Sequence, residues 1–335
     1  MKILVLGASG HIGQRLISTL AETDWADPMG ASRHLSSNPN IRWCQVNSCQ
    51  QPELQTALQG MDAVVNCVAG DRSSIAQGAR VLAQAALQAG KPRIIHLSTQ
   101  SVYGAVEGRI AEAAPLDPGL GWYGQAKCEA EVHFRHYARL GGVSLIVRPG
   151  CVYGPGSQLW VGRIGRWLRA GRLGDLGVRG DGWSNLVHVD DVCTALMKLL
   201  RSAHKPGAFA AFNLAAPESP RWNAYFIDLA LAIGATPVRR IGRQVWLDAH
   251  LLGPPLKLVQ LATKKLAQST AALPDPIPPA LLRLWSQHIQ LDASAAMQQL
   301  ELNFTPYASG LESSAQWFLQ TQERHEKSTQ QVLSP

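Results

Sequence analysis

Strand-like apolar runs recur along the first half of the chain, with segments of helical periodicity between them. The runs are KILVLG (2–7), PMGASR (28–33), IRWCQV (41–46), AVVNCVAG (63–70), RIIHLST (93–99) and VSLIVRPG (143–150). Segments 11–23, 75–90 and 123–141 repeat apolar positions every three or four residues, which is typical of helices. Strands and helices that alternate in this way form βαβ units. We therefore expect an α/β fold with a Rossmann-type, doubly wound parallel sheet in residues 1–150.

The pattern changes after residue 150. Pro and Gly become more frequent, and most of the ten tryptophans lie in this half. Helical periodicity returns at 160–171, 189–203, 222–234 and 311–320, while a proline-rich stretch at 274–282 is typical of a connector. We expect residues 151–320 to form a smaller, mostly helical substrate-binding region, with some segments returning to the first sheet. Residues 321–335 are expected to form a flexible tail.

Composition argues against several classes of protein. The hydrophobic fraction of 46% and the mean hydropathy of −0.04 are those of a globular protein with a sizeable core. No apolar run approaches the ~20 residues of a membrane span, and the N-terminus lacks the pattern of a secretory signal, so we expect a cytoplasmic protein. The six cysteines show no CxxC or His-paired spacing, which favours free thiols and no metal site.

The net charge of +7 changes this picture little, because the cations are spread along the chain. The densest group, Arg163, Arg166, Arg169 and Arg172, lies along one side of a predicted helix. Its spacing fits a solvated surface, or a site for an anionic group of a cofactor or substrate. We predict a small-molecule substrate and no nucleic-acid partner.

The loop GASGHIG follows the first strand and opens the first helix, which is where a dinucleotide-binding fingerprint is expected. In this arrangement Gly7 permits the tight turn, Gly10 lets a pyrophosphate approach the backbone, and Gly13 lets the helix pack closely on the strand. The helix N-terminus offers N–H groups and a partial positive charge to the phosphates. We expect the cofactor to contact Gly7, Ser9, Gly10, His11, Ile12 and Gly13.

The end of the second strand predicts which dinucleotide binds. An acidic residue there would accept hydrogen bonds from the ribose 2′-OH, but this chain has Ser32 followed by Arg33. No carboxylate repels a 2′-phosphate, and a guanidinium is present to pair with one. NADP(H) is therefore favoured over NAD(H), and residues 1–150 are predicted to form the NADP-binding domain.

Tyr123 and Lys127 are four residues apart at the start of a predicted helix, so both side chains project from one face. A neighbouring ammonium and an oxidised nicotinamide would both lower the tyrosine pKa from its usual ~10 and make it a useful proton carrier. Ser98 and Thr99 end the fifth strand at the sheet edge where ligands bind. We predict Tyr123, Lys127 and Thr99 as the catalytic residues.

Six motifs in this order, GASGHIG, VVNCVAG, LSTQSVYG, YGQAK, RPGCVYGPG and LVHVDDV, resemble those of the extended short-chain dehydrogenase/reductases. This group is also called the NAD-dependent epimerase/dehydratase family. The resemblance implies Tyr123 as the acid/base, Lys127 as a ligand of the nicotinamide ribose, and Thr99 as the hydroxyl that polarises the reacting carbonyl. It also implies a homodimer. Further cofactor contacts are implied at Asn47, Val68, Ala69, Gly70, Ser98, Pro149, Cys151 and Val152.

Departures from the family pattern bear on the substrate. Cys151 stands where the sugar-nucleotide enzymes usually have Asn, and Ser184 stands where they usually have a diphosphate-binding Arg. Gln100 and Ser101 follow Thr99, where a dehydratase would have acids. The second half is rich in Trp, and its end is similar to proteins related to 3-beta-hydroxysteroid dehydrogenases. These features favour an NADP-dependent oxidoreductase that interconverts a carbonyl and an alcohol on an apolar or aromatic molecule.

Two other functions remain open. A sugar-nucleotide epimerase or dehydratase with tightly held NAD(P) would place Arg163 or Arg166 on a phosphate. A dinucleotide-sensing regulator would have no need for Tyr123, Lys127 and Thr99 together. His188, Asp190 and Asp191 are interpreted as structural, with an Asp that caps the following helix.

Overall fold

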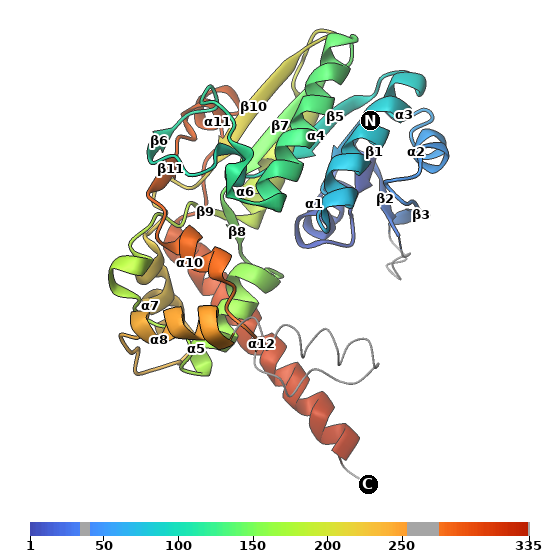
Figure 1. Cartoon of the computed structure of the whole chain (residues 1–335). Helices are drawn as coiled ribbons and strands as arrows, with labels where there is room; N and C mark the ends of the chain where they lie inside the picture. The colour runs from blue at the N-terminus through green and yellow to red at the C-terminus, as the bar shows by residue number, and fades with distance from the viewer. Residues whose placement is uncertain (34–40, 253–274, 334–335) are drawn as a thin grey trace. The chain divides into compact units, whose positions relative to one another are not determined.

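The computed structural model describes residues 1–33, 41–252 and 275–333 (Figure 1). The strands are β1 (Lys2–Leu6), β2 (Asp27–Ser32), β3 (Arg42–Gln45), β4 (Ala63–Asn66), β5 (Arg93–Leu97), β6 (Gly108–Ile110), β7 (Ser144–Pro149), β8 (Cys151–Tyr153), β9 (Leu186–His188), β10 (Phe209–Leu214) and β11 (Ile289–Leu291). The helices are α1 (His11–Ala21), α2 (Gln51–Ala57), α3 (Gly78–Gln88), α4 (Trp122–Arg139), α5 (Ile164–Arg169), α6 (Val189–Arg201), α7 (Trp222–Ala232), α8 (Gly242–Leu247), α10 (Pro279–Trp285), α11 (Ser294–Gln299) and α12 (Tyr307–Leu333).

Seven strands form one parallel sheet in the order β10-β7-β5-β4-β1-β2-β3 (Figure 1). The chain builds outward from β1 through β2 to β3, and then continues on the other side of β1 with β4. This confirms the predicted doubly wound α/β fold. The strand order reverses between β1 and β4, and ligands of such sheets bind at the carboxyl ends of the strands at that point.

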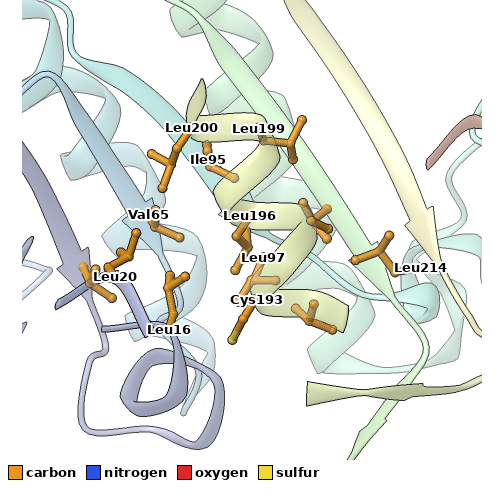
Figure 2. Packing of buried hydrophobic residues seen from close by; sticks show 14 of the residues in the cluster. Leu16, Leu20, Val65, Ile95, Leu97, Cys193, Leu196, Leu199, Leu200 and Leu214 are labelled. Carbon is orange, nitrogen blue, oxygen red and sulfur yellow. The ribbon is translucent and has the colours of Figure 1, made fainter. Parts of the chain in front are cut away.

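Helices cover both faces of the sheet, which explains why its strands read as nearly continuous apolar runs. On one face, α6 directs Cys193, Leu196 and Leu199 towards the sheet residues Ile95 and Leu97 (Figure 2). Leu4, Leu6 and Ile94 belong to the cluster on the other face, with residues of α2, α3 and α4. Side chains therefore pack on both faces of the central strands, at whose carboxyl ends ligands of such sheets bind.

Contacts divide the chain into two compact units. The first contains Met1–Val152, Val187–Pro217 and Leu291–Thr305, and it includes the seven-stranded sheet. The second contains the described residues of Tyr153–Leu186, Glu218–Gln290 and Pro306–Pro335. The assignment of one region to cofactor and another to substrate stays a prediction.

The core of the second unit is aromatic. Trp167, Trp222 and Trp285 are fully buried, and the Trp222 ring lies 6.3 Å from Trp285 and 5.6 Å from Phe226. These tryptophans pack against each other and leave no exposed indole at these positions for a ligand. They therefore lend no support to an apolar or aromatic substrate.

Two segments differ from their predicted form. Residues 321–333, predicted as a flexible tail, continue helix α12. In the proline-rich stretch, residue 274 lies outside the described residues, and α10 begins at Pro279, where the missing N–H costs no helical hydrogen bond. None of the described helices is long and apolar enough to cross a bilayer.

The buried His96 on β5 predicts a pH dependence of stability. Neither ring nitrogen has a hydrogen-bond partner among the described residues, and the ring packs against Phe134 with centroids 4.7 Å apart. Burial lowers the pKa of His96 well below its usual value, and the charge of Lys127 lowers it further. The folded protein therefore resists protonation of His96.

Below pH ~6.5 the unfolded chain binds a proton at His96 that the folded protein does not, so this group removes about 1.4 kcal/mol of stability per pH unit as the pH falls, until the folded pKa is reached. We expect urea denaturation at pH 7, 6 and 5 to show this loss in the wild type. His96→Phe, which keeps a ring against Phe134, should lose less stability over the same range. Identical pH dependence in both proteins would contradict the assignment.

Candidate active site

The glycine loop after β1 requires glycine at two positions for steric reasons. Gly7 has a φ of +75°, and a Cβ there would lie 3.0 Å from the carbonyl of Cys67. A Cβ on Gly13 would lie 2.3 Å from the carbonyl oxygen of Gly7. The N–H of Gly7 donates to Ala31 O at 2.9 Å, which ties the loop to β2. The loop and the start of α1 are therefore packed directly on the switch point of the sheet.

Gly10 meets a different environment. It is the N-cap of α1, and a Cβ there would find only Gly7 O within 4 Å, at 3.3 Å. Ser9 and Gly10 are exposed, while His11 and Ile12 are half-buried. The space beside Gly10 and the N–H groups at the start of α1 fit a pyrophosphate, which supports these residues as cofactor contacts.

Ser32 and Arg33 lie at the end of β2, as expected. Ser32 is buried, whereas Arg33 is exposed and its carbonyl accepts from Gln45 Nε2 at 3.1 Å. Hydrogen bonds from Ser74 lower the pKa of the Asp71 carboxyl, and the charge of Arg33 contributes to that shift. The side chain of Arg33 therefore lies near the loop that follows β4.

Asn47 lies in the turn before α2. Its Oδ1 accepts from the N–H of Cys49 at 3.1 Å, and its own N–H donates to Glu53 Oε2 at 2.7 Å. These bonds occupy Asn47 in the local turn. A contact between Asn47 and the cofactor stays a prediction.

The structure brings the three predicted catalytic residues together at the carboxyl edge of β5. Tyr123 lies in the first turn of α4, and its hydroxyl interacts with the Thr99 side chain. Lys127 lies one turn later, is only 2% exposed, and its Nζ donates to Leu97 O at 2.7 Å and to Val68 O at 3.3 Å. The ammonium group thus joins the ends of β4 and β5, beside the glycine loop.

Burial controls the protonation of this pair. It raises the pKa of Tyr123 to about 12, although the interaction with the Thr99 side chain acts in the opposite direction. Burial also lowers the pKa of Lys127 to about 8, against the charges of Cys67 and Glu131. The sequence predicts a lowered Tyr123 pKa; in the protein alone desolvation is larger, and the phenol is protonated at neutral pH.

Among the other predicted cofactor residues, Ser98 differs from the expectation, because its side chain does not face the proposed cofactor site. The Ser98 hydroxyl donates inward to Glu131 Oε1 at 2.5 Å. It is engaged in the protein interior, so only the backbone of Ser98 is left to meet a cofactor. Sequence reasoning missed Glu131, although its spacing of four from Lys127 places it on the same helix face.

The remaining predicted contacts lie on three elements. Ala69 and Gly70 are exposed after β4, and Val68 offers its carbonyl to Lys127. Pro149 ends β7, and the nearby Cys151 and Val152 are buried in β8. Cys151 Sγ accepts from Gln100 Nε2 at 3.6 Å.

His188, Asp190 and Asp191 are structural, but the cap differs from the expectation. The His188 side chain, and not an Asp, caps α6 by accepting from the N–H of Asp190 at 3.4 Å. Asp190 pairs with Arg15 at 2.5 Å, and Asp191 accepts from Thr305 Oγ1 at 2.6 Å. Within the described ranges, no group of three His, Cys, Asp or Glu side chains is arranged to hold a metal ion.

Three of the four arginines on and around α5 contact Asp275. Arg163 makes two hydrogen bonds to Asp275, at 2.9 and 2.8 Å, and Arg166 lies 3.7 Å from the same side chain. Arg172 donates to the Asp275 carbonyl at 2.7 Å. An internal acid thus already faces the arginines for which the sequence allowed an anionic ligand.

The fold and this site are those of a dinucleotide-dependent enzyme, and comparison with known proteins identifies the family. The sequence pattern of the NAD dependent epimerase/dehydratase family matches residues 3–215. The chain therefore belongs to the NAD dependent epimerase/dehydratase family.

Several relatives are similar over most of their length. Protein YeeZ of Escherichia coli (strain K12) is 31% identical over 252 residues, which cover 71% of this chain and 86% of that protein. A dTDP-glucose 4,6-dehydratase of Actinoplanes sp. is 29% identical over 259 residues, which cover 64% of this chain and 79% of that protein.

Solved structures show the same fold. MoeE5 in complex with UDP-glucose and NAD aligns over 100% of both chains, with a TM-score of 0.70 and 21% identity. UDP-glucose 4-epimerase of Thermotoga maritima with UDP-glucose aligns over 96% of this chain and 99% of that one, with a TM-score of 0.72 and 20% identity.

These similarities correct the predicted function. A carbonyl–alcohol oxidoreductase for an apolar molecule, related to 3-beta-hydroxysteroid dehydrogenases, is wrong. Similar proteins are named for dTDP-glucose, UDP-glucose and UDP-glucuronic acid, and one for a sugar diphosphate linked to undecaprenol. The physical reason for the error lies in the tryptophans that indicated an aromatic binding region, Trp160, Trp167, Trp183 and Trp222. Trp167 and Trp222 are fully buried in a core with Trp285, and Trp160 and Trp183 are half-buried.

Gly10 and Gly13 allow cofactor binding to be separated from folding. Gly10→Ala meets only one atom at 3.3 Å, so we expect a melting temperature near that of the wild type and about tenfold weaker dinucleotide binding by titration calorimetry. Gly13→Ala would clash with the loop itself and should lower both the melting temperature and the affinity. Unchanged affinity in Gly10→Ala would contradict a pyrophosphate site at this loop.

Proposed function

We propose that the chain is a nicotinamide-dinucleotide enzyme that acts on a sugar nucleotide by oxidising a hydroxyl of the sugar to a ketone and later reducing it. The names of its relatives, including dTDP-glucose 4,6-dehydratase and UDP-glucose 4-epimerase, support this substrate class. The observation that carries the proposal is the grouping of Tyr123, Thr99 and the buried Lys127 ammonium at the end of β5, beside the glycine loop.

The residues present fit a dinucleotide. Gly7 and Gly13 hold the loop close to the sheet, and Gly10 leaves space at the N-terminus of α1. A bound dinucleotide supplies the hydride acceptor of the reaction. Lys127, whose Nζ already donates to two carbonyls, has a third N–H with which to bind a ribose hydroxyl.

Tyr123 and Thr99 handle the proton. Thr99 holds the substrate hydroxyl by a hydrogen bond, and Tyr123 removes its proton as the ketone forms. With a pKa of about 12 in the protein alone, Tyr123 needs added positive charge to do this. Lys127, with a pKa of about 8, is mostly an ammonium at pH 7 and helps to stabilise the phenolate.

The residues after Thr99 favour an epimerase over a dehydratase. Loss of water from a keto sugar needs a proton donor for the departing hydroxyl. Gln100 is neutral, buried and hydrogen-bonded to Cys151, and Ser101 donates its N–H to Thr99 Oγ1 at 3.2 Å. Neither position carries a carboxyl group, so we propose inversion at the carbon that is oxidised as the net reaction.

Tyr123→Phe tests the role of the phenol. We expect it to lower the turnover of UDP-glucose or dTDP-glucose at least about a hundredfold, because the proton acceptor is lost, while dinucleotide affinity stays within about threefold. Products are read by nuclear magnetic resonance, which distinguishes an inverted carbon from a 4-keto-6-deoxy sugar.

Thr194→Val, an exposed site on α6 remote from Tyr123 in the sequence, serves as a control with wild-type turnover. If Tyr123→Phe kept wild-type turnover, Tyr123 would not be the acid/base. A dinucleotide sensor would bind the cofactor and turn over none of these sugars in the wild type.

We propose that Arg33 makes the enzyme prefer NADP(H) over NAD(H). The wild type should bind NADPH at least about tenfold more tightly than NADH, because a guanidinium pairs with the 2′-phosphate. Arg33→Ala should abolish this difference and leave NADH affinity unchanged, as measured by quenching of protein fluorescence. Tighter binding of NADH by the wild type would assign NAD(H) instead.

The homodimer implied by the family resemblance and the cytoplasmic location remain predictions.

A further inference from the structure

One row of side chains on α4 meets three consecutive residues at the end of β5. Tyr123, Lys127 and Glu131 are four residues apart, so they lie along one face of the helix. Tyr123 interacts with the Thr99 side chain, Lys127 donates to Leu97 O, and Glu131 accepts from the Ser98 hydroxyl.

Glu131 is a buried carboxylate with a fixed partner. Its side chain is 1% exposed and that of Arg148 is 2% exposed. Arg148 donates through Nε to Oε1 at 3.0 Å and through Nη2 to Oε2 at 2.7 Å, and Ser98 Oγ donates to Oε1 at 2.5 Å. Three charge-assisted hydrogen bonds therefore hold both carboxylate oxygens in place.

Arg148 also makes hydrogen bonds through Nη1, the guanidinium nitrogen that does not contact Glu131. Its Nη1 donates to Tyr103 OH at 2.8 Å and to Glu112 O at 3.0 Å. Tyr103 OH donates to Asn213 Oδ1 at 2.7 Å, which links the network to β10. These bonds hold the guanidinium in place against Glu131, so the pair connects α4 to the sheet.

A buried ion pair is weak evidence for stability, because desolvation of both charges offsets their attraction. Its best-attested use is to set the register of packed elements. Here the pair contacts Ser98, which directly precedes Thr99, and lies on the helix that carries Tyr123.

We propose that Glu131, held by Arg148, is a positioning residue: through Ser98 it sets the register of α4 on β5 that aligns the Tyr123 hydroxyl with Thr99. This inference rests on the proposed function, since it assumes that Tyr123 carries the proton. Alignment affects the proton-transfer step and leaves the binding of substrate and dinucleotide largely unchanged, so it acts on kcat more than on KM.

Ser98→Ala tests the role, because it removes one hydrogen bond and leaves the Glu131–Arg148 pair intact. We expect a crystal structure of the variant with dinucleotide to show the Tyr123 hydroxyl shifted relative to Thr99 Oγ1, compared with the wild type. On UDP-glucose or dTDP-glucose, whichever the wild type converts, kcat should fall about tenfold with KM and dinucleotide Kd within about twofold. Ser98→Thr restores a hydroxyl and should recover most of kcat.

Tyr137→Phe is the matched control. It removes a buried hydrogen bond, from Tyr137 OH to Pro92 O at 2.6 Å, near the other end of the same helix. It should lower the melting temperature about as much as Ser98→Ala and leave kcat unchanged.

An unchanged position of the Tyr123 hydroxyl relative to Thr99 in Ser98→Ala, or an equal loss of kcat in Tyr137→Phe, would overturn the positioning role. Tyr123→Phe in the same assay separates the two proposals. If Tyr123→Phe abolishes turnover while Ser98→Ala keeps the wild-type kcat, the proposed function stands and Glu131 is merely structural; if Tyr123→Phe turns over normally, the proposed function itself fails.

Discussion

The site depends on the burial of one ammonium group, that of Lys127, between the ends of β4 and β5. A cation that is 2% exposed has lost most of its hydration and requires acceptors from the protein. Leu97 O and Val68 O supply them, and both carbonyls lie just where parallel strands end. The ammonium therefore joins the ends of β4 and β5, and neighbouring groups must accommodate its charge.

The charges of the residues around Lys127 are adjusted to its positive charge. His96 is held neutral on β5, and Glu131 places a carboxylate one turn along α4. Arg148 neutralises Glu131 in turn, so the buried charges of Lys127, Glu131 and Arg148 sum to one positive charge near the phenol. Burial is the largest of the causes that raise the pKa of Tyr123 to about 12, and this excess positive charge has the sign that opposes the shift.

The error about the substrate has a simple physical origin. A tryptophan in the sequence indicates a large apolar surface, but not whether that surface faces a ligand or another ring. Trp167, Trp222 and Trp285 face one another in the second unit, and the arginines that would meet a phosphate face Asp275. Side-chain environments in an irregular region depend on packing between distant segments, which periodicity does not encode.

Taken alone, the sequence determined the parallel sheet, the glycine loop and the Tyr123–Lys127 spacing, because each depends on local geometry: strand and helix periods, steric demands at glycine, and neighbours four residues apart on a helix. It did not reveal β10, α2 or the partners of Ser98. Only the tertiary structure decided that the Ser98 hydroxyl faces inward to Glu131 and that burial keeps Tyr123 protonated. Both outcomes come from long-range packing, in which residues more than thirty positions apart exclude water from the same small volume.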